Sequence, residues 1–250
     1  IGVDSFLVTP CYWQTKGEYL WHTAVDDLWV TWRGQAVQAK AFYSEANGSP
    51  TFLIDYPPLF HRDSIYGYTE DYERFAFFNH AALALIQRLG TAPDIVHLND
   101  WHCGFAAVEL ASRRRHEPYW QGTRTVFSIH NMAYQGGFGM GQLPALGFTS
   151  TFARNAFNFN GYASAMKAGL EVSDTLSTVS KRYAHEIQTA EFGHDLDWLT
   201  RQRSSRLIGI TNGVDYDEWN PETDKELPVH FSKSDLSGKA DCKRALLEQF

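Results

Sequence analysis

The sequence predicts an α/β domain with a mostly parallel sheet and a mixed or antiparallel excursion near its start. The first reason is that strand-like segments alternate with segments of helical periodicity between residues 71 and 211, which is typical of a parallel sheet covered by helices on both faces. The second is that several strand-like segments before residue 56 are separated by turns. The third is that two later segments end in titratable side chains, and open α/β sheets bind ligands at that edge.

Four strand-like segments open the chain. They are rich in apolar, aromatic and β-branched side chains and span residues 6–9, 28–32, 39–43 and 51–55. Pro10 ends the first segment, because proline cannot donate to a strand ladder. Arg33-Gly34 and the stretch from Asn47 to Pro50 have the composition of turns. Tight turns join antiparallel strands, so this part of the chain predicts the mixed or antiparallel excursion.

A regular alternation of helices and strands follows. Apolar side chains recur at helical spacing from Asp71 to Leu89, and Gly90 marks the end of that helix. After it we expect strands at 95–98, 125–129, 175–179 and 207–211, and helices at 103–115, 161–172 and 181–190.

The character of the chain changes near residue 220. Asn220 to Asp224 is polar and rich in turn residues, and Ser237 can cap a helix that continues to the last residue. We therefore expect residues 1–219 to form a Rossmann-like domain. Residues 220–250 should form a linker and a helix that leads to a further domain outside the chain.

Composition excludes several classes of protein. A net charge of −7 lacks the basic footprint of a nucleic-acid-binding protein. Three cysteines, Cys11, Cys103 and Cys242, are too few for a disulfide framework, which favours a reducing compartment. His97, His102 and Cys103 do not have the spacing of a structural zinc site, so no metal is expected. No apolar run approaches the length of a membrane span.

The strand at 95–98 runs directly into polar side chains. Asn99, Asp100 and His102 stand where the strand should give way to a helix, and free backbone N–H groups at such a junction can meet an anion or a hydroxyl. Asp100 alone could accept hydrogen bonds from sugar hydroxyls or could cap the helix. The cluster as a whole favours a functional site.

The strand at 125–129 ends in the same way. His130 and Asn131 follow it, and Gly136-Gly137 closes the segment. An imidazole beside an amide at a strand end suits a pocket better than a packed core, although Asn131 could also bond its own backbone in a turn. Because carboxyl ends of parallel strands share one edge of the sheet, we expect His130 to lie near Asp100.

Two further segments are weaker candidates. Asn212 follows the strand at 207–211 in an Asn-Gly-x-Asp turn. Tyr68 precedes the helix at 71–89, among aromatic and carboxylate side chains for which helix capping is the simplest explanation.

Together and in this order, these segments resemble the bacterial glycogen synthase and plant starch synthase family. The resemblance covers nearly the whole chain and extends through a linker segment that begins at Ser237. The matching segments are His97-Leu-Asn-Asp-Trp-His102, Phe127-Ser-Ile-His-Asn-Met-Ala-Tyr-Gln-Gly136, Leu176-Ser-Thr-Val-Ser180 with Tyr183 and Glu186-Ile187, and Gly209-Ile-Thr-Asn-Gly-Val-Asp215 with Trp219-Asn-Pro-Glu-Thr-Asp224.

The resemblance implies the Rossmann-like N-terminal half of a two-domain, GT-B type glycosyltransferase. Such enzymes transfer glucose from ADP-glucose, or from UDP-glucose in some relatives, to the non-reducing end of α-1,4-glucan. They retain the anomeric configuration and use no metal or other cofactor. The implied partners are the glucan acceptor and the nucleotide-sugar donor, and the implied compartment is the bacterial cytoplasm or the plastid stroma of a plant.

The resemblance also implies roles for single residues. His130 would lie beside the donor glucose and stabilise the reacting centre, and Asp100 would orient the reacting sugars. Tyr68 and Asn212 match positions that line the sugar pocket. His102 and Asn131 would support these groups from behind.

Some parts of the family pattern are not found in the chain. No Lys-x-Gly-Gly-Leu loop, which holds nucleotide phosphates in the family, is present, and residues 6–9 align with the strand after it. The first strand of the fold is therefore expected to be missing, as is the second Rossmann domain with its phosphate-neutralising Arg and Lys. Asn99 replaces a common His, and Lys181-Arg182 replaces a usual Pro-Thr, which are tolerable variations of the pattern. Because both phosphate-binding elements are missing, we expect the chain alone to be catalytically inactive.

Three alternatives remain open on the sequence. One is another GT-B glycosyltransferase, of the sucrose or trehalose-phosphate type. Another is a glucan-binding module without catalysis. A nucleotide-binding dehydrogenase is disfavoured, because no Gly-x-Gly-x-x-Gly follows a predicted strand.

Overall fold

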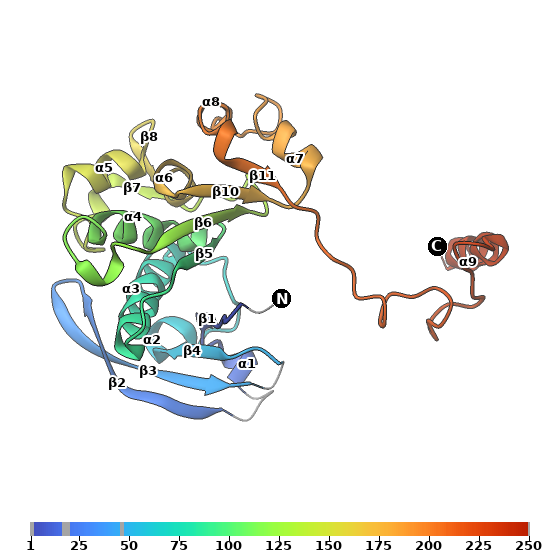
Figure 1. The fold of residues 1–250 in the computed structure, drawn as a ribbon, viewed down its shortest axis with the longest axis horizontal. Helices are drawn as coiled ribbons and strands as arrows, with labels where there is room; N and C mark the ends of the chain where they lie inside the picture. The colour runs from blue at the N-terminus through green and yellow to red at the C-terminus, as the bar shows by residue number, and fades with distance from the viewer. Residues whose placement is uncertain (1–2, 17–20, 46–47, 250) are drawn as a thin grey trace. The chain divides into compact units, whose positions relative to one another are not determined.

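The computed structural model describes residues 3–16, 21–45 and 48–249. Their contacts divide the chain into a unit of residues 1–210 and a unit of residues 211–250. The first unit holds both large sheets and the packed core, and the second holds a single helix, α9 (Ser237–Leu247). Figure 1 shows the helices and strands of each unit.

Sheet A is the expected mixed excursion. Its strands lie in the order β1-β4-β3-β2, with β1 parallel to β4 and the other pairs antiparallel. The edge strand β2 alternates buried and exposed side chains, so its outward face tolerates polar residues that the sequence prediction left outside a strand. The bounds are β1 (Leu7–Pro10), β2 (His22–Trp32), β3 (Gln35–Ser44) and β4 (Thr51–Asp55).

Sheet B is entirely parallel, as predicted. Its strands lie in the order β11-β10-β6-β5, and the four correspond to the four strands expected after residue 90. The inner strands β6 and β10 are largely buried, whereas β5 at the edge is largely exposed. The bounds are β5 (Ile95–Asn99), β6 (Arg124–Ile129), β10 (Thr175–Thr178) and β11 (Leu207–Gly209).

The helices begin and end at residues whose chemistry explains the boundary. Helix α3 (Asp71–Leu89) ends at Gly90, which adopts a left-handed φ of 94°. Helix α6 (Ala165–Val172) begins after Ser164, whose hydroxyl accepts from the N–H of Lys167. Ser180 caps α7 (Lys181–Glu186) in the same way. Helix α4 (Gly104–Arg113) packs against both α3 and α6 (Figure 1).

One predicted helix starts later than expected. Residues 161–164 form a turn and a strand rather than the first turn of the helix, because Asn160 and Gly161 adopt left-handed φ angles of 51° and 88°. They join β8 to β9 in a small antiparallel sheet C with the order β7-β9-β8. Its bounds are β7 (Gly137–Gly139), β8 (Asn158–Phe159) and β9 (Tyr162–Ser164).

Several short helices were not predicted from the sequence. Most span a single turn, which leaves too few residues for a helical period to be recognised. They are α1 (Trp13–Lys16), α2 (Pro57–Phe60), α5 (Thr151–Phe157), α8 (Asp197–Gln202) and the 3₁₀ turns Trp101–Cys103, Pro118–Trp120, Met140–Gln142 and Ser204–Arg206.

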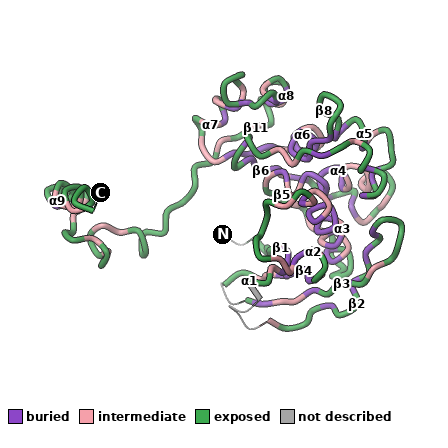
Figure 2. The backbone as a smooth tube through the Cα atoms, turned by 180° about the vertical axis from the view of Figure 1, so that it is seen from behind, coloured by how far each residue is buried: buried purple, intermediate pink, exposed green. Residues whose placement is uncertain are grey.

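The core of the first unit is one continuous apolar cluster. Figure 2 shows the buried backbone concentrated in β6, α3, α4 and α6. No helix in the described part of the chain is both long and apolar enough to cross a membrane. In the second unit nearly every described residue is exposed or half-buried, and Gly238 alone is buried.

The contact of α4 with α6 depends on Gly104. A Cβ atom at this position would lie 2.0 Å from the carbonyl oxygen of Ala165. We expect Gly104→Ala to lower the free energy of unfolding by about 1–3 kcal/mol, because backbone must move to relieve the clash. Gly141→Ala is the matched control, since nothing lies within 4 Å of its added Cβ. Urea denaturation of the chain checks this, and equal stability of the two variants would contradict it.

A partly buried ion pair joins α3 to α4. His80 Nδ1 lies 2.5 Å from Glu109 Oε2, and His80 Nε2 lies 2.8 Å from the carbonyl oxygen of Leu146. Burial alone would lower the pKa of His80, but the Glu109 carboxylate and the Leu146 carbonyl outweigh it and raise that pKa. Burial would raise the pKa of Glu109, but His80 and Arg113 lower it.

Because the pair needs a protonated His80 and an ionised Glu109, its contribution to the free energy of unfolding depends on pH. His80 contributes fully to the free energy of unfolding below its unfolded pKa of about 6.5. This contribution is lost as the pH rises through the raised pKa of His80 in the folded state. The contribution of Glu109 is complete above about 4.3 and is lost as the pH falls through its lowered folded value. We expect urea unfolding to show the stabilisation between these limits, and a smaller pH dependence in His80→Asn. The exposed His116→Asn is the control, and identical profiles for His80→Asn and wild type would contradict the assignment.

Candidate active site

The carboxyl ends of β5 and β6 meet at one edge of sheet B. The two strands are parallel neighbours with Asn99 opposite Ser128. The N–H of Asp100 continues the ladder by donating to the carbonyl oxygen of Ser128 over 2.9 Å. The structure therefore brings together the two polar clusters that the sequence places after these strands.

The side chains of Asp100 and His130 each hydrogen-bond to the chain segment that carries the other residue. The Asp100 Oδ1 atom accepts from the backbone N–H of His130 over 2.8 Å. The His130 ring reaches back, with Nε2 3.0 Å from Asn99 Oδ1. Because an amide oxygen can only accept, this contact is made by an Nε2–H group, and the tautomer with its proton on Nε2 leaves Nδ1 able to accept from a hydroxyl. His130 is exposed, so this nitrogen can be reached by a ligand at the sheet edge.

The backbone at Asp100 is strained. Its φ of 56° and ψ of −176° lie in a region that glycine adopts readily and other residues rarely do. The side chain makes no cap hydrogen bond to the 3₁₀ turn that follows, so the capping explanation for Asp100 is wrong. Strain of this kind costs about 1–3 kcal/mol and is concentrated at functional sites.

Asn131 stabilises the loop after β6. Its Oδ1 accepts from the N–H of Ala133 over 3.0 Å, which is the turn that the sequence allowed as an alternative. The next residue, Met132, donates its N–H to the hydroxyl of Tyr183 on α7 over 3.1 Å. Tyr183 thus holds the loop that carries His130 and Asn131.

His102 lies behind the edge rather than on it. Its ring packs on Trp101 with centroids 4.1 Å apart and meets the edge of Phe75 at 4.4 Å. Burial lowers the pKa of His102, against smaller opposing effects of Asp100 and Asp71. The ring is therefore neutral at pH 7. The backbone carbonyl oxygen of His102 accepts a hydrogen bond from Asn79 Nδ2 over 2.7 Å. The supporting role that the family resemblance implies for His102 stays a prediction.

Tyr68 contributes to a small cavity beside Trp101. The cavity has a volume of about 180 Å³. Gly136 adopts a left-handed φ of 58° there, and an added Cβ would lie 2.1 Å from the ring of Trp101. Only glycine permits this approach of the loop after β6 to the turn after β5. The lining residues are Tyr68, Thr69, Asp71, Tyr72, Trp101, Gly136 and Gly137.

An ion pair that the sequence analysis missed fixes the segment of Tyr68. Arg74 is fully buried, with Nη1 2.5 Å from Asp71 Oδ1 and its guanidinium 5.0 Å from the centroid of the Tyr68 ring. The other oxygen of Asp71 accepts from the N–H groups of Gly67 and Tyr68. The available signal was an arginine on the apolar face of a helix, since a buried charge is almost always paired.

Asn212 belongs to the other unit. It lies in the exposed segment after β11, in residues 211–250. Asp100, His130, His102 and Tyr68 all belong to the first unit.

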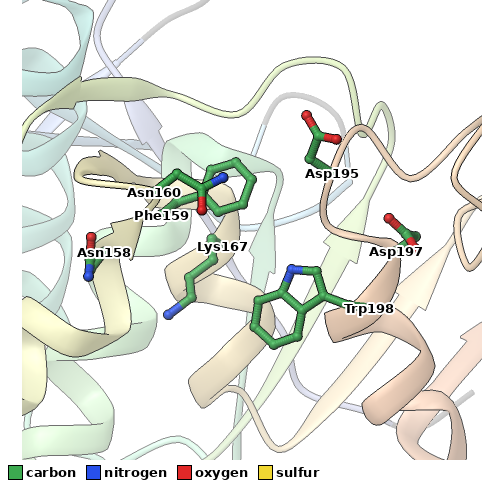
Figure 3. Close-up of a pocket in the computed structure, with 7 residues that line it drawn as sticks. All are labelled: Asn158, Phe159, Asn160, Lys167, Asp195, Asp197 and Trp198. Atoms are coloured by element: carbon green, nitrogen blue, oxygen red, sulfur yellow. The ribbon is translucent and has the colours of Figure 1, made fainter.

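A second, larger hollow lies between sheet C and α8. Its volume is about 770 Å³. Trp198 is 46% exposed, and Figure 3 shows its indole near the side chain of Lys167. No sequence motif marks this site, because its residues come from β8, α6, α8 and the loops beside them. They are Asn158, Phe159, Asn160, Lys167, Asp195, Asp197 and Trp198.

This hollow is linked to the loop after β6. Gln135 Nε2 donates to the carbonyl oxygen of His194 over 2.7 Å, next to Asp195. Lys167 is almost fully buried and donates to the carbonyl oxygen of Asn155 over 2.8 Å, with Glu171 as its ion-pair partner. The indole and the carboxylate and amide groups around it match what sugar rings and hydroxyls need.

Comparison with known proteins gives a consistent result. Residues 1–202 match the model of the starch synthase catalytic domain family. A glycogen synthase of Anaeromyxobacter dehalogenans (strain 2CP-1) is 45% identical over 221 residues, which are 86% of this chain and 46% of that protein. A glycogen synthase of Clostridium kluyveri is 39% identical over 249 residues, which are 96% of this chain and 51% of that protein. The chain spans about half the length of these relatives.

A solved structure has the same fold. The catalytic domain of starch synthase IV from Arabidopsis thaliana, bound to ADP and acarbose, matches with a TM-score of 0.79 and 30% identity over 97% of this chain and 51% of that chain. This confirms the predicted α/β class and the GT-B type of fold. By the match of its sequence and its fold, the chain belongs to the starch synthase catalytic domain family.

Proposed function

We propose that the chain is the acceptor-side domain of a retaining glucosyltransferase. The enzyme would add glucose from ADP-glucose to the non-reducing end of α-1,4-glucan. The observation that carries this proposal is the cluster of Asp100 and His130 at the carboxyl ends of β5 and β6, in a chain of the starch synthase family. The bacterial glycogen synthases among its relatives favour the bacterial cytoplasm as its compartment.

The geometry suits a reaction in which positive charge develops on a sugar ring. In glucosyl transfer the bond from C1 to the leaving phosphate oxygen breaks, a bond from C1 to the acceptor hydroxyl oxygen forms, and the proton of that hydroxyl passes to the leaving phosphate. Groups that hydrogen-bond more strongly to the transition state than to the substrate accelerate this step. His130 offers Nδ1 to a sugar hydroxyl, and Asp100 fixes the backbone of His130 while its second oxygen can accept from a sugar. Tyr68 would line the same pocket, and the family resemblance implies a sugar-binding role for Asn212.

Two arguments support ADP-glucose as the donor and inactivity of the chain alone. The related starch synthase IV domain was solved with ADP bound. The chain contains no Lys-x-Gly-Gly sequence to hold the phosphates. Without neutralisation of the diphosphate, departure of the leaving group is not assisted.

Incubation of the chain with ADP-glucose and maltooligosaccharide tests this proposal. We expect no elongation from the chain alone, and elongation with retained configuration from the gene product that contains it. Transfer by the chain alone at the rate of an intact glycogen synthase would contradict the proposal that this chain is inactive by itself. A product other than α-1,4-glucan, such as sucrose or trehalose phosphate, would contradict the proposed acceptor.

A glucan-binding role without catalysis is the second candidate, favoured by the hollow around Trp198. In that case Trp198→Ala should weaken maltooligosaccharide binding in a calorimetric titration, whereas Asp100→Ala should leave it unchanged. If Asp100 instead belongs to a catalytic site that holds the glucan, Asp100→Ala should also weaken maltooligosaccharide binding. The two variants therefore separate the candidates.

A further inference from the structure

Three potential metal ligands converge at the edge of sheet A. Strands β1 and β4 are parallel with Pro10 opposite Ile54, and the N–H of Cys11 donates to the carbonyl oxygen of Ile54 over 2.8 Å. Cys11 and Asp55 therefore leave the sheet side by side. The single turn of α2 then reverses the chain and returns His61 to Asp55, with His61 Nε2 2.9 Å from Asp55 Oδ1.

The three donor atoms are close enough to share one ion. The Cys11 sulfur, an Asp55 carboxylate oxygen and a His61 ring nitrogen all lie within 4.8 Å of one another. A tetrahedral zinc site with ordinary bond lengths places such atoms about 3.4–3.6 Å apart. Binding of an ion would draw the three donor atoms together to this spacing. Within residues 3–16, 21–45 and 48–249, this is the one group of three or more His, Cys, Asp or Glu side chains with such geometry.

Burial and ligand chemistry favour a specific cation. Cys11 is 0% exposed and Asp55 is 6% exposed, while the His61 side chain is 23% exposed and leaves a path to solvent. A thiolate ligand disfavours Mg²⁺ and Ca²⁺, which prefer oxygen. A set of one sulfur, one nitrogen and one oxygen ligand suits Zn²⁺, with water in the fourth position.

We propose that Cys11, Asp55 and His61 bind one Zn²⁺ ion. On binding, the Cys11 thiol loses its proton to solvent, and the thiolate, the neutral His61 ring and the Asp55 carboxylate coordinate the ion. This site is separate from the cluster of Asp100 and His130 and takes no part in glucosyl transfer. Its existence does not depend on the proposed function.

The position of the site suggests what the ion would stabilise. His61 opens the segment of residues 61–70, which ends beside the Tyr68 cavity. Trp13 packs edge-on against His61 with centroids 5.5 Å apart, and Gln14 Nε2 donates to the carbonyl oxygen of Asp63 over 2.7 Å. A bound ion would add a bond between this segment and the ends of β1 and β4.

Cobalt and zinc titrations of the chain, after removal of metals with a chelator, test the proposal. Co²⁺ is the probe, because a cysteine thiolate bound to it gives a charge-transfer band in the near ultraviolet. We expect one Co²⁺ per chain with this band, its loss when Zn²⁺ is added, and a rise in the thermal midpoint with Zn²⁺. Cys11→Ser should abolish the band. His61→Asn should weaken binding by more than the roughly 10- to 100-fold caused by loss of an outer-shell partner.

His61→Asn is the decisive variant if Cys11→Ser does not fold, because His61 is partly exposed. Cys242→Ser is the matched control, since this cysteine lies in the second unit and its sulfur contacts the carbonyl oxygen of Val229. The control should bind the metal as the wild type does. Absence of the band in the wild type, or unchanged binding by His61→Asn, would overturn the proposal.

Discussion

Replacing His130 with alanine should lower kcat for glucosyl transfer by roughly 10²–10³-fold, the usual effect of losing one hydrogen-bonding group at a developing charge. The measurement is transfer of labelled glucose from ADP-glucose to maltooligosaccharide by the gene product that contains this chain. The His130 ring is exposed and hydrogen-bonds to the side chain of Asn99. Its loss should therefore change the free energy of unfolding by less than about 1 kcal/mol.

His116→Ala is the matched control, because His116 is also an exposed histidine and lies beyond the end of α4. It should transfer glucose at the wild-type rate. Wild-type kcat in His130→Ala, or an equal loss of kcat in both variants, would show that His130 has no specific role in glucosyl transfer.

Replacing Asp100 with glycine should separate stability from activity. Glycine accepts the φ of 56° without strain, which returns about 1–3 kcal/mol. The lost hydrogen bond to the His130 N–H costs about 0.5–1.5 kcal/mol, and the extra freedom of the unfolded chain costs about 0.5–1 kcal/mol. We expect the free energy of unfolding to stay within about 1 kcal/mol of wild type, while transfer falls by at least roughly 10²-fold.

Asp100→Ala is the matched comparison for this variant. It loses the same carboxylate but keeps a side chain in the strained conformation. Urea denaturation should therefore rank Asp100→Ala below Asp100→Gly in stability, while both are inactive. An active Asp100→Gly enzyme would show that Asp100 serves only the conformation of the turn.

The alternation of strands and helices was predictable because each element carries a local signal. Helix α3 matches its predicted bounds, since it has both a helical period and a terminal glycine. The start of α6 was predicted four residues too early, because Ala163 is apolar but pairs with Phe138 in β7. A contact between distant segments decided that structure, and no short window of sequence contains it.

In the candidate site, too, some features follow from local sequence and others depend on contacts between distant segments. Asp100 and His130 could be placed together because parallel neighbouring strands bring their carboxyl ends to one edge. The role of Arg74 beneath Tyr68 and the hollow beside Trp198 could not be predicted in this way. They depend on loops and single turns, whose path is set by tertiary packing. The convergence of Cys11, Asp55 and His61 likewise needs the pairing of β1 with β4.

The most direct test of the central claim is a crystal structure of the gene product that contains this chain, with ADP and maltooligosaccharide bound. We expect a sugar ring at the carboxyl ends of β5 and β6, with a hydroxyl hydrogen-bonded to His130 Nδ1 and another to the Asp100 carboxylate. A glucan bound only at the Trp198 hollow, with no sugar within hydrogen-bonding distance of Asp100 or His130, would contradict it.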